Sequence, residues 1–262
     1  MPLLVRLLSS SKGKEAEYAA RALSIIEQDR SIHGKPTHVE VGAVPALVRM
    51  LSSSKGDEAM WASSALWNMT AGDITQRRQA CVEAGAVPAL VRLLSSSKGR
   101  EAERAVGALA NIVAGNAVCD AACKAASVAA GAVPLLVCLL QSSRGWTLEL
   151  AMRALRNITA GDDECKQACV SAGAVPELIE HLTLCNRSDG EYHYGIKAEH
   201  SAAALYNIAL GDATCKAACV EAGAIPALVE CMNSHSKNAL RQIASHSEEY
   251  LQLVIAAGYN LD

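Results

Sequence analysis

The sequence predicts an all-α solenoid of about six three-helix repeats, and the main evidence is one motif that recurs along the 262 residues. The motif reads Ala-Gly-Ala-Val-Pro-x-Leu-Val, and an Ala-Leu-x-Asn-Ile segment follows it before the next copy begins. A repeat of this length is typical of helical solenoids, in which each unit buries its apolar face only against its neighbours. The motif prolines, separated by 43, 43, 46, 42 and 50 residues, are Pro2, Pro45, Pro88, Pro134, Pro176 and Pro226.

Composition supports the same fold class. Half of the residues (51%) are apolar, which is enough for a sizeable core. Ala, Leu and Val dominate, aromatic residues make up 3% and Phe is absent, which favours closely packed short helices over a sheet sandwich. Length alone admits two domains, but the unbroken repeat predicts one solenoid over residues 1–262.

The net charge and the hydropathy pattern exclude some classes of binding partner. A net charge of −3 gives no overall attraction to nucleic acid or to an anionic membrane. The N-terminal apolar run is too short for a secretory signal, and no stretch approaches eighteen consecutive apolar residues. We therefore expect an intracellular protein, cytoplasmic and/or nuclear, which is a monomer, binds no nucleic acid and does not insert into a membrane.

Residues 164–211 contain every part of one repeat. The first helix, ECKQACVSA, is expected to end at Gly173, because glycine adopts the left-handed conformation without steric cost. Pro176 is then expected at the first position of the second helix, where it loses no hydrogen bond. The third helix carries one apolar stripe, for example Ala102, Val106, Leu109 and Val113.

Loops join the second and third helices. Three of them contain Ser-Ser-Ser-Lys-Gly, in which serine caps and glycine breaks a helix. The longest repeat carries extra residues near 184–195, and the sequence predicts that Tyr192, His193 and Tyr194 lie in this loop as a possible extra contact. The alternative is an insertion without function, since loops accept added length at little cost.

The ends depart from the pattern. Ser24 and Gln242 stand where the other repeats have asparagine. Terminal repeats of solenoids are often altered to cover the core, although an abrupt start also fits a fragment of a longer protein. The predicted units are 1–31 (a partial N-terminal repeat), 32–73, 74–115, 116–161, 162–211 with the insertion, and 212–262 (a C-terminal capping repeat).

The three helices per repeat, the Gly-Ala-Val-Pro corner and the Ala-Leu-x-Asn third helix resemble the armadillo-repeat family, which includes β-catenin and importin-α. The resemblance covers essentially the whole chain, and two-helix HEAT repeats are the nearest alternative. It implies a right-handed superhelix whose third helices line a concave groove for an extended peptide. It also implies that the third-helix asparagine binds the backbone of that peptide.

One asparagine occupies the same helical position in four repeats, although asparagine is a poor helix former. An amide offers both a donor and an acceptor, so a row of amides is suited to gripping the peptide units of an extended chain. The alternative is that the amides bond to water or to neighbouring repeats and only shape the solenoid. The four residues of this asparagine ladder are Asn68, Asn111, Asn157 and Asn207.

Specificity is expected from residues beside the ladder. The clustered arginines are suited to a carboxylate or phosphate, which predicts an acidic residue near the centre of the ligand. Alternatively they pair with Glu103, Glu149 and Glu199. Two tryptophans would supply an apolar pocket, with one of them in the core. The predicted groove residues are Trp61, Ser64, Trp67, Arg104, Arg153, Arg156 and Tyr206.

Importin-α has tryptophan one turn before the ladder asparagine. This chain has no tryptophan at the corresponding positions, which are Ser64, Gly107, Arg153 and Ala203. An importin-like role in nuclear transport is therefore disfavoured, and the preferred reading is a scaffold or adaptor that binds a protein or peptide. The alternative from another class is a structural or regulatory arm of a larger protein.

The cysteines and histidines are the candidate residues for metal binding or catalysis. Pairs of cysteines spaced i, i+4 on adjacent first helices would offer four thiolates to zinc, but buried thiols that pack as small apolar groups are favoured. The sequence has no His-Glu-x-x-His, Gly-x-Ser-x-Gly or phosphate-loop motif, so we expect no enzyme, cofactor or metal. The pairs are Cys119 with Cys123, Cys165 with Cys169, and Cys215 with Cys219.

Overall fold

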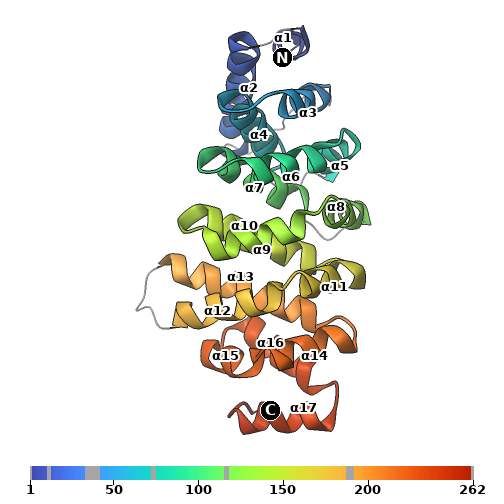
Figure 1. Cartoon of the computed structure of the whole chain (residues 1–262), viewed down its shortest axis with the longest axis vertical. Coiled ribbons are helices and arrows are strands. Elements are labelled where there is room, and N and C mark those ends of the chain that lie inside the picture. Colours follow the sequence, from blue (N-terminus) through green and yellow to red (C-terminus); the bar gives the residue numbers. More distant parts are fainter. Residues whose placement is uncertain are drawn as a thin grey trace. The chain divides into compact units, whose positions relative to one another are not determined.

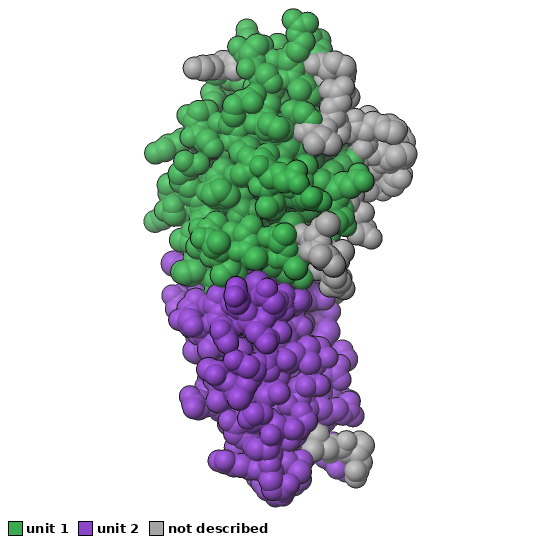
Figure 2. All heavy atoms as spheres, turned by 90° about the vertical axis from the view of Figure 1, so that its right-hand side faces the viewer, with its two compact units in different colours: residues 1–135 green, residues 136–262 purple. Residues whose placement is uncertain are grey.

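A computed structural model describes residues 2–10, 13–32, 42–71, 75–114, 118–186 and 192–260, and all regular structure in these residues is helical (Figure 1). This confirms the prediction of an all-α fold. The chain divides into two compact units, Met1–Leu135 and Leu136–Asp262, which are coloured separately in Figure 2. Each unit is a stack of helices that follow the predicted order within the repeat.

Unit 1 holds three pairs of second and third helices, α1 with α2, α3 with α4, and α6 with α7. The first helix α5 precedes α6, and the first helix predicted before α3 would lie at 33–41, outside the described residues. The helices of this unit are α1 (Pro2–Ser10), α2 (Lys14–Ile32), α3 (Ala43–Ser53), α4 (Asp57–Met69), α5 (Thr75–Glu83), α6 (Ala86–Ser96), α7 (Arg100–Ile112), α8 (Val118–Ala129) and the start of α9 (Ala132–Ser142).

Unit 2 begins within α9 and continues with two complete triplets, α11–α13 and α14–α16, before a final helix. The helices are α10 (Gly145–Thr159), α11 (Asp163–Ser171), α12 (Ala174–Asn186), α13 (Tyr192–Ala209), α14 (Ala213–Glu221), α15 (Ala224–Cys231), α16 (Ser234–Ala244) and α17 (Glu248–Ala256). The last helix buries Val254. It lies beside α16, so the last triplet has an added helix against it (Figure 1).

Third helices are neighbours within each unit. In unit 1, α4 packs against both α2 and α7, and in unit 2, α13 packs against both α10 and α16 (Figure 1). The predicted apolar stripe Ala102, Val106, Leu109 and Val113 is buried, and its last member is the C-cap residue of α7. Among the described residues no single helix is long and apolar enough to cross a membrane; only the bent pair of segments Ala121–Ala129 and Ala132–Ser142 together has the length and composition.

The corner between first and second helices forms as predicted at glycine. Gly85, Gly173 and Gly223 have φ of 77°, 78° and 82°, in the left-handed region that glycine adopts without strain. The predicted position of Pro176 is wrong, because α12 begins at Ala174 and the proline is its third residue. The first four N–H groups of a helix have no partner within the helix, so the missing N–H of proline costs nothing there either.

The junction between third and first helices uses an aspartate that the sequence reading did not identify. Asp162 accepts a hydrogen bond from the backbone N–H of Cys165 at 3.0 Å and caps α11. Asp212 does the same for Cys215 at 2.9 Å and caps α14. These backbone hydrogen bonds, which stabilise the ionised form, lower the pKa of both carboxyl groups.

A buried ion pair ties α5 to earlier helices of unit 1. Nη1 of Arg77 lies 3.5 Å from Oε2 of Glu27, which is fully buried on α2. The same nitrogen donates a hydrogen bond to the carbonyl oxygen of Met69, at the end of α4, at 3.1 Å. Arg77 therefore links a first helix to two preceding third helices.

The insertion of the longest repeat lengthens the third helix. Helix α13 has 18 residues, compared with 13 in α7, and begins at Tyr192. The prediction that Tyr192, His193 and Tyr194 lie in a loop is therefore wrong for the backbone, which forms the first turn of α13. Residues 192–209 contain no proline and are rich in alanine, so they form a helix readily. The side chains of these three residues lie outside the described residues.

Candidate functional site

The third helices of unit 1, α2, α4 and α7, form a surface that we call the third-helix face of this unit. It carries the first two ladder asparagines, both half-buried. Nδ2 of Asn68 donates to the carbonyl oxygen of Ser24 at 2.9 Å and to its hydroxyl at 3.1 Å. Nδ2 of Asn111 donates to the carbonyl oxygen of Trp67 at 2.9 Å. Each amide on α4 and α7 thus holds the backbone of the third helix before it.

The same interaction recurs in unit 2. Nδ2 of Asn207, on α13, donates to the carbonyl oxygen of Arg156 at 3.1 Å and lies 3.4 Å from Oγ1 of Thr159. Asn157 occupies the ladder position of α10 and is half-buried. Bonds from the amide to the neighbouring repeat, which the sequence left as an alternative, are therefore present. Contact between the ladder and a peptide stays a prediction.

Trp67 is part of the third-helix face of unit 1. Its indole lies over Gly107 of α7, where an added Cβ would stand 2.7 Å from ring atom Cδ2. The guanidinium carbon of Arg104 lies 5.1 Å from the centre of the same ring, which is a cation–π arrangement. Nη2 of Arg104 also lies 3.8 Å from Oε1 of Glu103. Arg104 thus pairs with both a tryptophan and a glutamate of its own unit.

Trp61 has a similar partner that the sequence reading missed. The guanidinium carbon of Arg21, on α2, lies 5.2 Å from the centre of the Trp61 ring. Neither Trp61 nor Trp67 is fully buried, so the expectation that one tryptophan belongs to the core is wrong. Each is covered on one side by an arginine of a neighbouring third helix.

Ser64 was predicted to line the groove, but its side chain is buried. Its residue is only 4% exposed, because α4 packs between α2 and α7 and the small side chain at this position falls inside that contact. Its side chain is therefore buried in the contact between third helices, and its predicted role in peptide binding stays a prediction.

The third-helix face of unit 2 gathers two arginines and a histidine. Nη1 of Arg156, on α10, lies 3.3 Å from Nδ1 of His200, on α13. Burial first, and then the positive charges of Arg156 and Arg153, lower the pKa of His200 to about 4. His200 is therefore neutral at pH 7, and its Nδ1 accepts a hydrogen bond from the guanidinium of Arg156.

Arg153 stands one turn before Asn157 and is half-buried. Burial lowers the pKa of its guanidinium, and the carboxylate of Glu149 opposes that effect. Glu149 is itself only 9% exposed. The alternative that this arginine pairs with a glutamate is thus supported for Glu149, while Glu199 is exposed.

Tyr206 and His235 extend the unit 2 face onto α16. Their ring centroids are 6.5 Å apart with a tilt of 37° between the planes. Both residues are half-buried. The face therefore combines two guanidinium groups, neutral histidine and a tyrosine ring. The contact between His200 and Arg156 was not predicted from the sequence, because it depends on how α10 and α13 pack.

The described cysteines of the first helices are buried. Burial raises the pKa of Cys81, Cys169 and Cys219 to about 12, so these thiols stay protonated near neutral pH. Among the described residues, no group of three or more His, Cys, Asp or Glu side chains is placed to hold a metal ion. The side chain of Cys119, a member of one predicted pair, lies outside the described residues.

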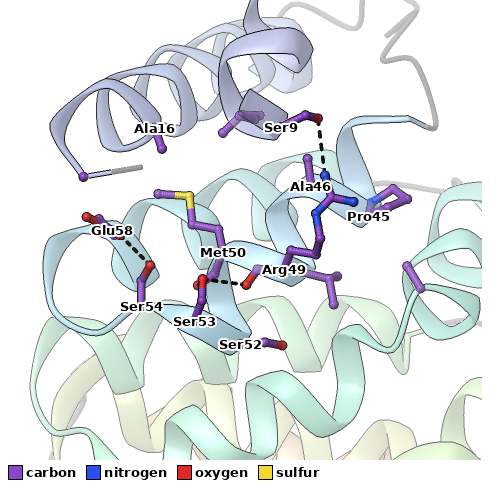
Figure 3. Close-up of a pocket in the computed structure, with 14 residues that line it drawn as sticks. Ser9, Ala16, Pro45, Ala46, Arg49, Met50, Ser52, Ser53, Ser54 and Glu58 are labelled. Atoms are coloured by element: carbon purple, nitrogen blue, oxygen red, sulfur yellow. Dashed lines mark hydrogen bonds between the residues drawn. The ribbon is translucent and has the colours of Figure 1, made fainter. Parts of the chain in front are cut away.

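A pocket of about 870 Å³ lies in unit 1 between the helices of the first two repeats (Figure 3). Nη2 of Arg49 reaches from α3 across its rim and donates to the hydroxyl of Ser9 at 3.3 Å. Met50 and Ala16 give the pocket an apolar wall, and Glu58 stands at the other end. This pocket involves α1 and α3, which are second helices, and it contains no ladder asparagine.

Comparisons with known proteins agree with this architecture. A family model described as Armadillo/beta-catenin-like repeat matches residues 75–114. No curated protein matches the chain by sequence. Among solved structures, an engineered protein from the Northeast Structural Genomics Consortium is 34% identical, with a TM-score of 0.79 over 93% of this chain and 96% of that one.

Two further structures are designed proteins. A crystal structure of computationally designed armadillo repeat proteins for modular peptide recognition is 31% identical, with a TM-score of 0.72 over 98% of this chain and 97% of that one. A designed armadillo repeat protein in complex with the peptide (KR)4 is 29% identical, with a TM-score of 0.74 over 92% of this chain and 98% of that one.

Proposed function

This chain belongs to the armadillo-repeat family, and we propose that it is a non-enzymatic scaffold or adaptor that binds an extended peptide along its third helices. A protein-binding scaffold is what the fold supports in general. One of the similar designed proteins holds a peptide, (KR)4. The finer statements, which concern the ladder and the acidity of the ligand, are argued from the residues of this chain.

The observation that carries the proposal is the state of the ladder amides. In Asn68 and Asn207, Nδ2 makes the hydrogen bonds to the preceding third helix, whereas Oδ1 accepts none from the described residues. Both residues are half-buried rather than enclosed. A peptide N–H that approaches this face would meet a fixed, half-exposed acceptor, because the amide is already held in place by its own donor.

Charge favours an acidic ligand for unit 2. The face carries Arg153 and Arg156, and His200 between α10 and α16 is neutral at pH 7. Guanidinium groups form two parallel hydrogen bonds with a carboxylate or a phosphate. A basic peptide such as (KR)4 would be repelled at the same place. We therefore propose an extended segment with an acidic residue opposite this part of the chain.

A second candidate is a structural or regulatory arm of a larger protein. It is favoured by the inter-repeat hydrogen bonds from Asn111 and Asn207, which would stabilise the stack even without a ligand. An importin-like adaptor is less favoured, because no tryptophan stands one turn before the ladder asparagines. A monomeric protein of the cytoplasm and/or nucleus remains our expectation.

To test the proposal, peptides that bind the wild-type chain are selected first, and their affinity for a variant without the ladder asparagines is then measured. A random dodecapeptide library is panned against the wild-type chain, and each enriched peptide is measured by fluorescence anisotropy. The variant changes Asn111, Asn157 and Asn207 to alanine. Its matched control changes three exposed amides on α5, α11 and α17, Gln79, Gln167 and Gln252, to alanine.

The ladder amides also hold neighbouring helices, so their removal could lower stability. The melting temperatures of both variants are therefore measured first, and the binding assays are run well below those temperatures. The proposal expects enriched peptides to lose at least tenfold in affinity for the ladder variant and to keep their affinity for the control, a difference of about 1.4 kcal/mol. Equal binding to the wild type and the ladder variant would reject the third-helix face as the site and favour the structural candidate.

A further inference from the structure

We infer that Arg156 and His200, with Arg153 beside them, form a subsite of unit 2 for one anionic group of the bound peptide, and that His200 takes up a proton when that group binds. The inference rests on the proposed function, since it assumes that a peptide lies along the third helices. It adds the chemistry of one contact and makes binding depend on pH.

The geometry of the subsite begins with the guanidinium of Arg156. One of its N–H groups donates to Nδ1 of His200 across 3.3 Å, and the others have no partner among the described side chains. The backbone beneath it is fixed, because the carbonyl oxygen of Arg156 accepts from Nδ2 of Asn207 at 3.1 Å. A planar group with unused donors on a fixed backbone is suited to bind an anionic oxygen.

His200 senses the charges around it. The titratable groups that act on it are Arg156 and Arg153 on α10 and His235 on α16, and none of them is negative. Two neighbouring cations and burial keep the ring neutral, and only 8% of the residue is exposed. An anion bound at this place would offset the two arginine charges and raise the pKa of His200 from about 4.

Proton uptake by His200 also changes its hydrogen bond with Arg156 in a way that favours the bound anion. Neutral His200 accepts from Arg156 through Nδ1, whereas protonated His200 carries a hydrogen on both ring nitrogens and accepts nothing. The proton comes from the solvent and stays on Nδ1. The N–H of Arg156 that pointed at Nδ1 is then released, and both cations donate to the same anionic oxygens. The ligand thus replaces the contact between Arg156 and His200 as the link across α10 and α13.

A carboxylate of Asp or Glu and a phosphate monoester share the chemistry that this subsite needs. They differ in their own titration, because the second pKa of a phosphate monoester lies near 6, so it loses charge over the range in which His200 would gain it. A carboxylate stays ionised through that range. The pH response is therefore measured with a carboxylate peptide, and the phosphate is compared at pH 7.5.

The experiment uses three capped octapeptides: (Glu-Ser)4, (Gln-Ser)4, and (Gln-Ser)4 with one central phosphoserine. Affinities for the whole chain are measured by titration calorimetry at pH 7.5 and pH 5.5, in buffers of different ionisation enthalpy. If the bound pKa of His200 returns to its ordinary value near 6.5, (Glu-Ser)4 binds about tenfold tighter at pH 5.5, with net proton uptake.

Variants assign the effect to residues. His200→Gln and His200→Asn are expected to remove the pH response, and Arg156→Gln to remove the preference for (Glu-Ser)4 over (Gln-Ser)4. The matched controls are Arg144→Gln and His246→Gln, at exposed positions outside the subsite. Two substitutions of the buried histidine are used so that one misfolded variant does not decide the result.

The outcomes separate this inference from the proposed function. An affinity for (Glu-Ser)4 that is unchanged or weaker at pH 5.5, or a full pH response in both His200 variants, overturns the inference while ladder-dependent binding still stands. Binding that survives removal of the ladder overturns both. Tighter binding of the phosphoserine peptide than of (Glu-Ser)4 at pH 7.5 identifies phosphate as the preferred group, and the reverse identifies carboxylate.

Discussion

The indole ring of Trp67 on α4 lies directly over Gly107 of α7, so close that a Cβ at position 107 would stand 2.7 to 2.8 Å from three ring atoms. A glycine in the middle of a helix is otherwise costly, by about 1 kcal/mol relative to alanine. The absence of a side chain at 107 is thus what lets a tryptophan of one repeat lie flat on the next. The stacking of Arg104 on the same ring completes the arrangement.

Replacing Gly107 with alanine is expected to destabilise the chain by about 1 to 3 kcal/mol, because the methyl group meets the ring and overpacking outweighs the gain in helix propensity. Chemical denaturation measures the change. In a Trp67→Ala background the ring is gone, and the same substitution is expected to be neutral or to stabilise by about 1 kcal/mol. Equal destabilisation in both backgrounds would show that Trp67 is not the obstacle.

Stability is expected to fall below pH 6.5 because of His200. Its folded pKa of about 4 lies below the ordinary 6.5, so between these values the unfolded chain binds more protons and is favoured as pH falls. From pH 7 to pH 5 this contributes a loss of about 2 kcal/mol. Denaturant unfolding of wild type and His200→Asn at both pH values measures it.

Carboxylates change stability over the same range in both proteins, so the informative quantity is the difference between wild type and variant. His246→Asn, at an exposed position, is the matched control and should follow the wild type. A variant at position 200 with the same loss between pH 7 and pH 5 as the wild type would contradict the neutral, buried state of His200.

The ion pair between Arg77 and Glu27 is expected to be sensitive to removal of either partner. Changing Arg77 to methionine removes the guanidinium that lies 3.5 Å from the fully buried carboxylate of Glu27 and should cost about 3 to 5 kcal/mol. The double variant, with Glu27 also changed to leucine, replaces both charges by apolar groups and should lose much less. Urea unfolding of the two single variants and the double variant checks this, and additive losses would refute the pairing.

Thiol reactivity is expected to follow burial. Cys138 is exposed, whereas Cys81, Cys169 and Cys219 are buried and have pKa values near 12. Raising the pKa of a thiol from 9 to about 12 lowers its thiolate fraction about a thousandfold near neutral pH. Brief alkylation of the native chain at pH 7.5, followed by peptide mapping, should label Cys138 and leave these three unmodified until the chain is unfolded. Early labelling of Cys169 would contradict its buried state.

Much of the fold followed from local signals in the sequence. The glycines at 85, 173 and 223 predicted the corners between first and second helices, because few other residues accept their backbone conformation. The apolar stripe of α7 predicted its buried face, since helical periodicity fixes which side chains share one side. The start of α12 was misplaced by two residues because proline is tolerated anywhere in the first helical turn.

The candidate site was predicted only in part. The position of Asn207 within its helix was readable, but the acceptor of its amide, the carbonyl oxygen of Arg156, lies 51 residues earlier in the chain. Ser64 has the same position in the repeat as Arg153, yet one is buried and the other half-exposed, because a small side chain fits between packed helices and a guanidinium does not. Periodicity gives the face of a helix, and the neighbours decide how deep that face lies.

The sequence by itself determined the helical class, the repeat and the row of asparagines, because each depends on residues close together in the chain. Only the tertiary structure decided that Arg156 donates to His200, that Arg21 stacks on Trp61 and that Arg77 reaches Glu27. These partners are 40 to 50 residues apart in the chain. They meet only when helices of adjacent repeats stack, and no local pattern encodes the distance and burial that follow from that packing.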